Sequence, residues 1–404
     1  MNFFRKHFTS EQKESSTPRV SNLDTNQRDL IWKRVNDTSN KGTIERTKFL
    51  ELYQQLAPIT ERLYVHLNGK HGKVTPQSVL SLADQLHGDC EEIVTTLLEI
   101  YSDLKTVLSS LVDCLATRKN LSLSEKEKVQ RYLVDDAPSD SSRFGRWLHA
   151  NPLMLPLIRF IFAPLYFEST DRYDLYPKLS TTSDILQMSA LIAINANLPM
   201  ERRKDWTLLF STNRQGASFS QLSQKIDAQG PCLLVVESRE GHVFGCFASD
   251  GFFTGPLFHG DATSFLFAAS PEIKISNATG HVKNYAYMNY QQQQMPNGIG
   301  LGGYETVWPF FIHEEFGRGQ CARHVASFEK IDLCDGSSEF SIKSIEAWRC
   351  GEKPRNFNPD GEEPTTPHAH KSVLDIDPQA KAILEMSGRK MHSEAYRDPE
   401  PMLD

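Results

Sequence analysis

Short apolar runs alternate with turn residues over the stretch that two tryptophans, Trp206 and Trp348, bracket. The runs are rich in β-branched and aromatic residues, and Gly, Asn, Asp and Ser separate them. This pattern is typical of strands in an antiparallel β-sandwich. The runs lie at 206–222, 232–249, 260–267 and 340–348.

Two of these runs predict a hairpin. Cys232–Val236 is apolar throughout, as expected for an internal strand that is covered on both faces. Gly241 supplies the positive φ that a tight three-residue turn needs. In the returning strand His242–Phe247, alternate residues face opposite sides. We expect Val243, Gly245 and Phe247 on one face, and His242, Phe244 and Cys246 on the other.

The preceding part of the chain, residues 21–170, has helical periodicity instead. Glu91–Thr117 carries apolar residues at spacings of three and four, which predicts one amphipathic helix. Ile44–Leu56 and Gln77–Leu86 repeat the pattern in shorter form, and another helix is expected around Thr182–Ile194. The fold class is therefore α+β. The predicted divisions are a disordered tail (1–20), a helical domain (21–170), a strand-rich domain (171–351), a proline-rich linker (352–371) and a C-terminal helix with its tail (372–404).

One apolar run, Pro152–Phe167, invites comparison with a membrane span. It has 16 residues, whereas a span needs about 20. Pro156, Arg159 and Pro164 interrupt it. A buried helix flanked by prolines is the predicted structure.

Composition favours a cytosolic globular protein. The 404 residues are 39% hydrophobic and 24% charged, as in ordinary soluble domains. A formal charge of −7 gives no general affinity for nucleic acid or anionic lipid. Seven scattered cysteines without a CxxC pair predict reduced thiols. Met1–Ser10 lacks the apolar core of a secretory signal, so we expect none.

A calcium-loop pattern occurs in the helical part without the ligands that calcium needs. Gly72 and Val74 fit positions 6 and 8 of an EF-hand loop. The ligand positions 1, 3, 5 and 12 then fall on Leu67, Gly69, His71 and Ser78, and none of them is a carboxylate. We therefore predict a degenerate EF-hand whose helix pair serves as a scaffold, and no metal site.

Two motifs resemble catalytic or cofactor signatures in only one respect. Gly298–Gly303 matches GxGxxG, but a β-type run follows it where a dinucleotide site needs a helix. A flexible hairpin or bulge between strands is predicted instead, and no cofactor. Gly216-Ala-Ser218-Phe-Ser220 lacks the closing glycine of a nucleophile elbow, so Ser218 is expected to cap a helix that begins near Phe219.

A thiol-based site is a further alternative. Cys321, His324 and the pair Glu314 and Glu315 lie within a short stretch and supply a nucleophile, a base and carboxylates. Such sets are recognised by geometry, which a sequence does not supply, so surface loop residues are the favoured interpretation.

Five segments together resemble the TLDc domain family over roughly residues 180–351. They are Trp206–Ser211, Arg214–Phe219, Val243–Ala248, Gly260–Phe267 and Ile345–Trp348. The helical flank and the segment Ser372–Gly388 resemble the mTOR-associated subfamily. The motif residues that the resemblance marks as structural are Trp206, Gly216, Ser218, Phe244, Gly245, Phe265, Phe267, Glu346 and Trp348.

The resemblance implies a β-sandwich without established catalytic activity. It further implies binding to the vacuolar-type proton ATPase at the lysosomal membrane and a role in nutrient signalling with components of the mTOR kinase pathway.

The sequence departs from the family pattern in two places. Asn2 replaces the glycine that relatives use for myristoylation, so we expect any membrane attachment to come through a protein partner or another surface. The stretch Phe316–Lys330 keeps Gly317 and Gly319 but otherwise fits the family poorly.

A short helix is predicted near the C-terminus. Asp377 fits the N-cap, Pro378 the first turn and Gly388 the position after the end. Helices of this length are marginal alone, so this helix must dock on its own domain or on a partner. The resemblance favours a partner. The predicted contact residues are Asp377, Ala380, Ile383, Leu384 and Ser387.

The leading hypothesis is thus a non-enzymatic, monomeric adaptor in the cytosol and at the lysosome. A hydrolase or redox enzyme that uses Cys321 and His324 is one alternative, and a calcium-responsive binding module is another.

Overall fold

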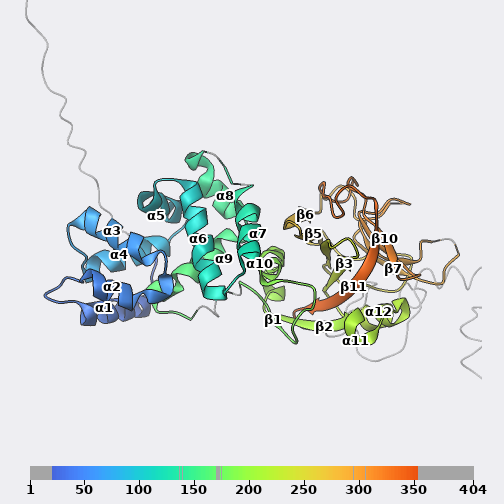
Figure 1. Ribbon diagram of the computed structural model, residues 1–404, viewed down its shortest axis with the longest axis horizontal. Coiled ribbons are helices and arrows are strands. Elements are labelled where there is room, and N and C mark those ends of the chain that lie inside the picture. Colours follow the sequence, from blue (N-terminus) through green and yellow to red (C-terminus); the bar gives the residue numbers. More distant parts are fainter. Residues whose placement is uncertain are drawn as a thin grey trace, which may run out of the picture. The chain divides into compact units, whose positions relative to one another are not determined.

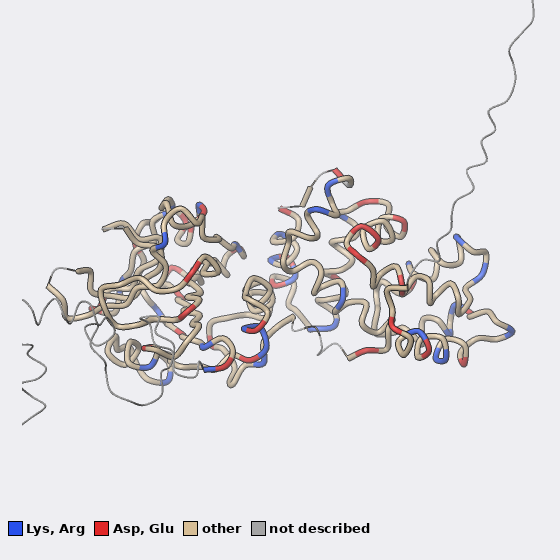
Figure 2. The backbone as a smooth tube through the Cα atoms, turned by 180° about the vertical axis from the view of Figure 1, so that it is seen from behind, with Lys and Arg blue, Asp and Glu red and all other residues tan. Residues whose placement is uncertain are grey.

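The computed structural model describes residues 21–135, 137–138, 140–169, 173, 175–293, 295–304 and 306–353. All of them belong to one compact unit, Met1–Arg355. Helices precede an antiparallel sheet along the chain, as the sequence predicts (Figure 1). Basic and acidic residues are interspersed along the described backbone (Figure 2).

The helices of the N-terminal part share one hydrophobic core, which extends from Leu23 to Ala196. Asp24 caps the first of them, since its side chain accepts the N–H of Gln27 while the Gln27 side chain accepts the N–H of Asp24. The helices are α1 (Thr25–Thr38), α2 (Arg46–Leu52), α3 (Thr60–His71), α4 (Pro76–Leu86), α5 (Cys90–Tyr101), α6 (Leu104–Lys119), α7 (Leu123–Val134), α8 (Phe144–Ala150) and α9 (Met154–Phe162).

The single helix predicted over Glu91–Thr117 is wrong, because the chain breaks it into α5 and α6. Ser102 adopts the left-handed conformation (φ +65°) and ends α5. Asp103 then starts α6, and its carboxylate accepts the N–H and the hydroxyl of Thr106. Side chains such as Asp103 compete for backbone donors and so begin helices. The apolar spacing continues across the break, which hides it from a periodicity argument.

The apolar run Pro152–Phe167 forms α9 and the 3-10 turn Ala163–Tyr166, and the core buries most of it. The predicted buried helix is confirmed. Within the described residues, no single helix is long and apolar enough to cross a membrane. Only α8 and the segment Met154–Tyr166 reach that length together, and the pair is bent by 95°.

The loop between α3 and α4 is much shorter than the calcium-loop pattern in the sequence suggests. Helix α3 continues to His71, so the pattern positions at Leu67, Gly69 and His71 lie within a helix. Only residues 72–75 separate α3 from α4. The N–H of Ile44, which precedes α2, donates to the carbonyl of Val74 (2.9 Å) and joins the two helix–loop–helix pairs.

One strand, β11 (Glu339–Cys350), connects both parts of the sheet. It pairs with β10 near its start and with β3 and β2 towards its end, so the described strands form one continuous path instead of two separate sheets. The path is β6-β5-β4-β3-β11-β10-β9-β8-β7, with β2 pairing β11 and β1. The other strands are β1 (Lys178–Leu179), β2 (Asp205–Ser211), β3 (Cys232–Ser238), β4 (Val243–Ala248), β5 (Phe265–Ser270), β6 (Lys274–Asn277), β7 (Ala286–Asn289), β8 (Gly298–Leu301), β9 (Phe310–His313) and β10 (Arg318–Gln320).

Both faces of β3 are covered, which confirms the prediction from its apolar run. Leu234 and Val236 belong to a core that they share with β7, β8 and β9. Leu233 and Val235 belong to a second core against the helix α10 (Met188–Asn197). The turn after β3 places Gly241 at φ +90°, as expected.

Helix α10 is buried on every side. Ile192 and Ala196 pack into the helical core, whereas Leu191 and Ile194 pack into the core on the sheet. A helix that is apolar all round suits such a position. It begins later than the predicted Thr182, because the preceding residues are bound to Glu346 of β11. Two short helices follow β2, namely α11 (Thr212–Gln215) and α12 (Phe219–Ile226).

Candidate functional site

The buried carboxylate of Glu346 ties the entry segment of the sheet domain to β11. Its oxygens accept the hydroxyl of Ser183 (2.5 Å), the N–H of Asp184 (2.7 Å) and the indole N–H of Trp348 (3.0 Å). Glu346 is 1% exposed. A buried carboxylate needs such donors. Since its described contacts are all internal hydrogen bonds, this residue holds structure together.

The other motif residues also fill structural positions. Trp206, Phe265, Phe267 and Trp348 are buried in the core against α10, and Phe244 is buried in the other core of the sheet. A Cβ on Gly245 would lie 1.9 Å from the carbonyl oxygen of Leu234, so β3 and β4 meet too closely there for any side chain. Gly216 has φ +81° and ends α11.

Ser218 is the N-cap of α12, as predicted. Its hydroxyl accepts the N–H of Gln221 at 3.3 Å. The hydroxyl also lies 3.1 Å from that of Ser220. These contacts account for a serine at this position without a nucleophilic role.

Residues 298–301 of the glycine run form the strand β8, and Gly302 and Gly303 begin the connection to β9. The sequence predicted a flexible hairpin or bulge between strands, so the prediction is wrong for the first four residues of the run. Gly298 and Gly300 lie in β8, opposite β9. A Cβ on Gly303 would lie 2.1 Å from the ring of Trp308, and one on Gly300 would lie 2.7 Å from the ring of Phe311. The glycines therefore leave room for two aromatic rings, which are tilted by 38° with their centroids 4.6 Å apart. The pattern has a packing cause.

The residues of the thiol-based alternative are separated. Cys321 is buried and its Sγ donates to the carbonyl of Ser337 (3.3 Å), whereas His324 is exposed. Glu314 accepts the side-chain amide of Asn297 (3.1 Å), and Glu315 pairs with Arg318 (2.8 Å). The structure therefore offers no contact between this thiol and a base among these residues.

The structure does bring Ser218 together with Glu314 and Glu315, in a groove beside α12. We call it the α12 groove. Its volume is about 710 Å³. Four chain segments line it: 217–227, the connection between β4 and β5 at Thr254, the loop after β7, and the turn between β9 and β10. Its lining residues are Ala217, Ser218, Phe219, Ser220, Ser223, Gln224, Asp227, Thr254, Tyr290, Gln291, Glu314, Glu315 and Phe316.

The α12 groove combines carboxylates with aromatic rings. Phe219 and Tyr290 meet edge to face at 6.4 Å. Asp227 accepts the N–H of Thr254, and Glu314 accepts that of Gln291 (3.3 Å). Neutral backbone donors therefore hold both carboxylates in place. Asp227, Glu314 and Glu315 line the groove and the described lining residues include no Lys or Arg, while Arg318, outside the lining, pairs with Glu315.

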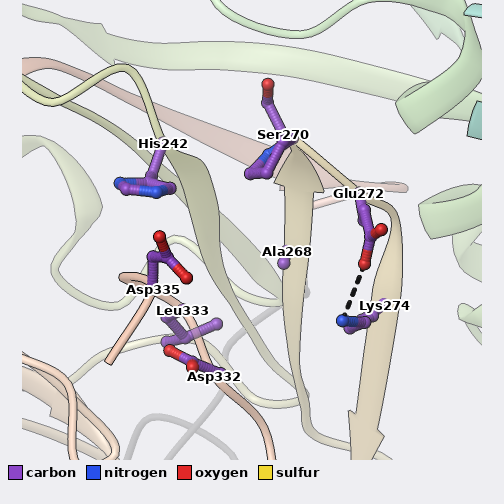
Figure 3. A pocket seen from close by; sticks show the side chains of 9 residues that line it. His242, Ala268, Ser270, Glu272, Lys274, Asp332, Leu333 and Asp335 are labelled. Atoms are coloured by element: carbon purple, nitrogen blue, oxygen red, sulfur yellow. Dashed lines mark ion pairs between the residues drawn. The ribbon is translucent and has the colours of Figure 1, made fainter. Parts of the chain in front are cut away.

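A smaller cavity of about 270 Å³ lies at the opposite edge of the same domain. Figure 3 shows Asp332 and Asp335 on one side of it and Glu272 and Lys274 on the other. Lys274 pairs with Glu272 at 2.9 Å. Three carboxylates, Glu272, Asp332 and Asp335, line this cavity against one lysine, so its described lining is acidic as well.

Sequence reasoning missed two aromatic residues of the α12 groove, Tyr290 and Phe316, because each lies in a turn with no periodic pattern. Phe316 has φ +52° and Gln291 has φ +57°. Such conformations are unusual for residues other than glycine and leave no composition signal.

The predicted contact residues Asp377, Ala380, Ile383, Leu384 and Ser387 lie outside the described residues.

Comparison with known proteins agrees with this architecture. Residues 179–351 match the TLDc domain family. The chain contains a TLDc domain. It is also similar to the mTOR-associated protein MEAK7 of Xenopus laevis, at 32% identity over 72% of this chain and 66% of that protein. The Homo sapiens protein of that name is 37% identical over 53% of the chain and 45% of its own length. The Danio rerio protein of that name is 27% identical over 83% of this chain and 82% of its own length.

The TLDc match contains Glu346, the glycine run and the α12 groove. The aligned part spans only about half to two thirds of the Homo sapiens and Xenopus laevis relatives. Their names connect those proteins with the mTOR kinase.

Proposed function

We propose that this chain is a non-catalytic adaptor that binds the vacuolar-type proton ATPase at the lysosomal membrane and supports nutrient signalling through the mTOR pathway. The relatives' names support the mTOR connection. The family resemblance supports the pump and the lysosome. In this proposal the protein acts as a monomer and reaches the membrane through its protein partner.

The observation that carries the adaptor role is the α12 groove. The groove is an open surface that combines hydroxyls, carboxylates and aromatic rings. Aromatic residues are frequent anchors at protein interfaces. Three carboxylates favour a partner segment that carries Lys or Arg beside apolar residues. The groove is thus the proposed contact for a pump subunit.

A second contact is proposed for the C-terminal segment. Ile383 and Leu384 would anchor its predicted helix on another subunit, and Asp377, Ala380 and Ser387 would lie beside them. Two linked contacts strengthen binding because the second becomes intramolecular.

A truncation separates the two contacts. Purified full-length protein and a variant that ends at Gly351 are compared in a pull-down with the pump's peripheral sector. The proposal expects the truncated protein to bind, but more weakly than the full chain. Equal binding would remove the C-terminal segment from the mechanism, and absence of binding by the full chain would refute the adaptor proposal.

The helix pairs α1–α2 and α3–α4 are proposed to be a scaffold of EF-hand origin. The hydrogen bond from the N–H of Ile44 to the carbonyl of Val74 links the two pairs and supports this proposal. Within the described residues, no group of three or more His, Cys, Asp or Glu side chains is arranged to hold a metal ion. We expect the melting temperature to be the same with and without calcium, because a ligand of the native state would raise it.

A further inference from the structure

The strand β6 lies at one end of the sheet, and only part of its outer edge is covered. Asn277 directs its backbone groups outward: its N–H donates to the Glu329 carboxylate (3.3 Å), and its carbonyl accepts the N–H of Glu329 (3.0 Å). The N–H of Thr279 continues this contact by donating to the carbonyl of Ser327 (3.0 Å). The segment 327–329 therefore forms a short cover that runs antiparallel to the chain at 277–279.

The cover ends before it reaches Ile275. Alternate residues of an antiparallel strand direct their N–H and C=O to the same side, so the backbone groups of Ile275 point outward like those of Asn277. Among the residues that the structure describes, neither backbone group of Ile275 has an outward hydrogen-bond partner. An uncovered strand edge is a template for one more strand.

This free edge forms one side of a groove of about 500 Å³, which we call the β6 groove. Helices α7 and α8 form the other side, across from β6 (Figure 1). The half-buried rings of Tyr132 and Trp147 line that side. The Tyr132 hydroxyl accepts the side-chain amide of Asn197 (3.1 Å), and Trp147 stacks on Phe144 at 5.6 Å between centroids. An extended backbone can therefore lie between a strand edge and two aromatic rings that are held in place.

Beside the free edge, two cations share one carboxylate. Arg131 of α7 and Lys274 of β6 both pair with Glu272, at 3.4 and 2.9 Å. The described lining also includes Asp135, Glu329 and Lys330. Because that lining has as many acidic as basic side chains, any selection by charge falls on the local cluster around Glu272, where a second carboxylate would complete the pairing.

We propose that the β6 groove binds an extended segment of a partner protein in which an apolar residue is followed by Asp or Glu. The segment adds a strand to β6, so main-chain hydrogen bonds supply affinity and alternate side chains supply specificity. Its apolar residue lies opposite Ile275, donates its N–H to the Ile275 carbonyl and accepts the Ile275 N–H. In the antiparallel direction that the segment 327–329 already has, the next residue lies opposite Lys274. Its carboxylate then joins Arg131 and Lys274.

The same pairing determines where the apolar side chain lies. Residues opposite each other on two strands share one face of the sheet, so this side chain lies beside that of Ile275. Ile275 packs at the rim of the core that the sheet forms with α10, and Asn197 at the end of α10 holds the Tyr132 ring. The apolar residue therefore covers surface that is half-buried in the free protein. This contact lies outside the α12 groove and goes beyond the adaptor proposal.

The test measures binding of synthetic peptides to the full chain by fluorescence anisotropy. The probe is a labelled hexapeptide, Thr-Ser-Ile-Asp-Ser-Thr, with an amidated C-terminus. We expect saturable binding with a dissociation constant below about 1 mM. A peptide with an N-methylated isoleucine lacks the N–H that the Ile275 carbonyl accepts, and it should bind at least about fivefold more weakly. Hydrogen exchange should slow at residues 272–277 when the probe is bound.

Charge reversal tests the side-chain contact. Lys274→Glu should weaken binding of the probe by about fivefold or more, and a peptide with Lys in place of Asp should bind this variant better than it binds the parent. Lys283→Glu, an equal charge reversal at another exposed lysine of the same domain, should bind the probe like the parent. The exchanged preference separates a lost contact from a folding defect, because a misfolded variant would bind neither peptide.

Three results would overturn the proposal. The first is the absence of saturable binding up to about 5 mM probe. The second is equal binding of the N-methylated peptide, which would exclude strand pairing. The third is tighter binding by a variant that ends at Gly351 than by the full chain, which would assign the groove to the chain's own C-terminal residues in place of a partner. The pump is absent from all of these measurements, so they stand apart from the test of the adaptor proposal.

Discussion

The indole N–H of Trp348 donates to the carboxylate of Glu346 at 3.0 Å, two residues away on the same strand. Both side chains are buried, at 0% and 1% exposure. The same carboxylate binds the backbone and side chain of the segment that leads into α10. One buried carboxyl group therefore links the long central strand to the segment that leads into the helix shared by both cores.

Replacing Glu346 should destabilise the protein strongly, because the buried donors that it accepts from would lose their acceptor. Glu346→Ala leaves the Trp348 indole and the Asp184 N–H without acceptors, and we expect a loss of about 3–4 kcal/mol in the free energy of unfolding. Glu346→Gln keeps an acceptor oxygen and should cost about half as much. Urea denaturation measures both. The control Glu315→Ala, at a side chain that is 69% exposed, should change stability by less than about 0.5 kcal/mol.

The glycine run should be intolerant of alanine where Trp308 lies over it. In Gly303→Ala the new methyl group meets the indole at 2.1 Å, and we expect a loss of about 2 kcal/mol together with a shift in tryptophan emission. Gly317→Ala is the matched control, because no atom lies within 4 Å of its Cβ position. If Gly303→Ala folds with unaltered stability and emission, the packing cause is wrong.

Arg118 should stabilise the helical core through three carbonyl groups. Its guanidinium donates to Gln55, Phe160 and Ile161, each at 2.7 Å. Arg118→Met should lose about 3 kcal/mol, and Arg118→Lys should recover little of it, since an ammonium cannot reach all three acceptors. Thermal unfolding followed by circular dichroism measures both. The exposed ion-pair residue Arg318 supplies the control Arg318→Met, which should unfold like the parent.

The break between α5 and α6 should respond to acid. Hydrogen bonds from the side chain and N–H of Thr106 hold the pKa of Asp103 below its usual range. A carboxylate with a lowered pKa contributes stability above its unfolded pKa, near 4, and loses it as the pH falls through the folded value. Asp103→Asn keeps an acceptor but no charge. Its deficit relative to the parent should therefore be constant near pH 7 and shrink below about pH 4 in urea titrations. A constant difference down to pH 2 would contradict this cause.

Local patterns predicted the main elements because they follow from short-range chemistry. The apolar run in β3 implied two covered faces, and Ser218 implied a helix cap. The break at Ser102 was missed because the apolar stripe continues in register through it. The start of α10 was also missed, since it depends on Glu346, which lies far along the sequence.

The α12 groove was beyond sequence reasoning for a related reason. Glu314 was considered only beside Cys321, its neighbour in the chain. The fold instead brings it to Tyr290 and Ser218, through strand pairing between β8 and β9. Side chains that meet through tertiary structure leave no spacing to detect.

Binding to the proton pump tests the adaptor account most directly. The full chain is titrated onto the immobilised peripheral sector of the vacuolar-type ATPase, and the dissociation constant is measured. We expect saturable binding that Tyr290→Ala and Glu315→Lys each weaken by about tenfold or more, because one removes an aromatic anchor and the other reverses a charge of the α12 groove. Glu240→Lys, an equal charge reversal on the exposed turn between β3 and β4, should bind like the parent. Saturable binding that neither groove variant weakens would contradict the groove as the contact, and no binding by the full chain would contradict the adaptor account itself.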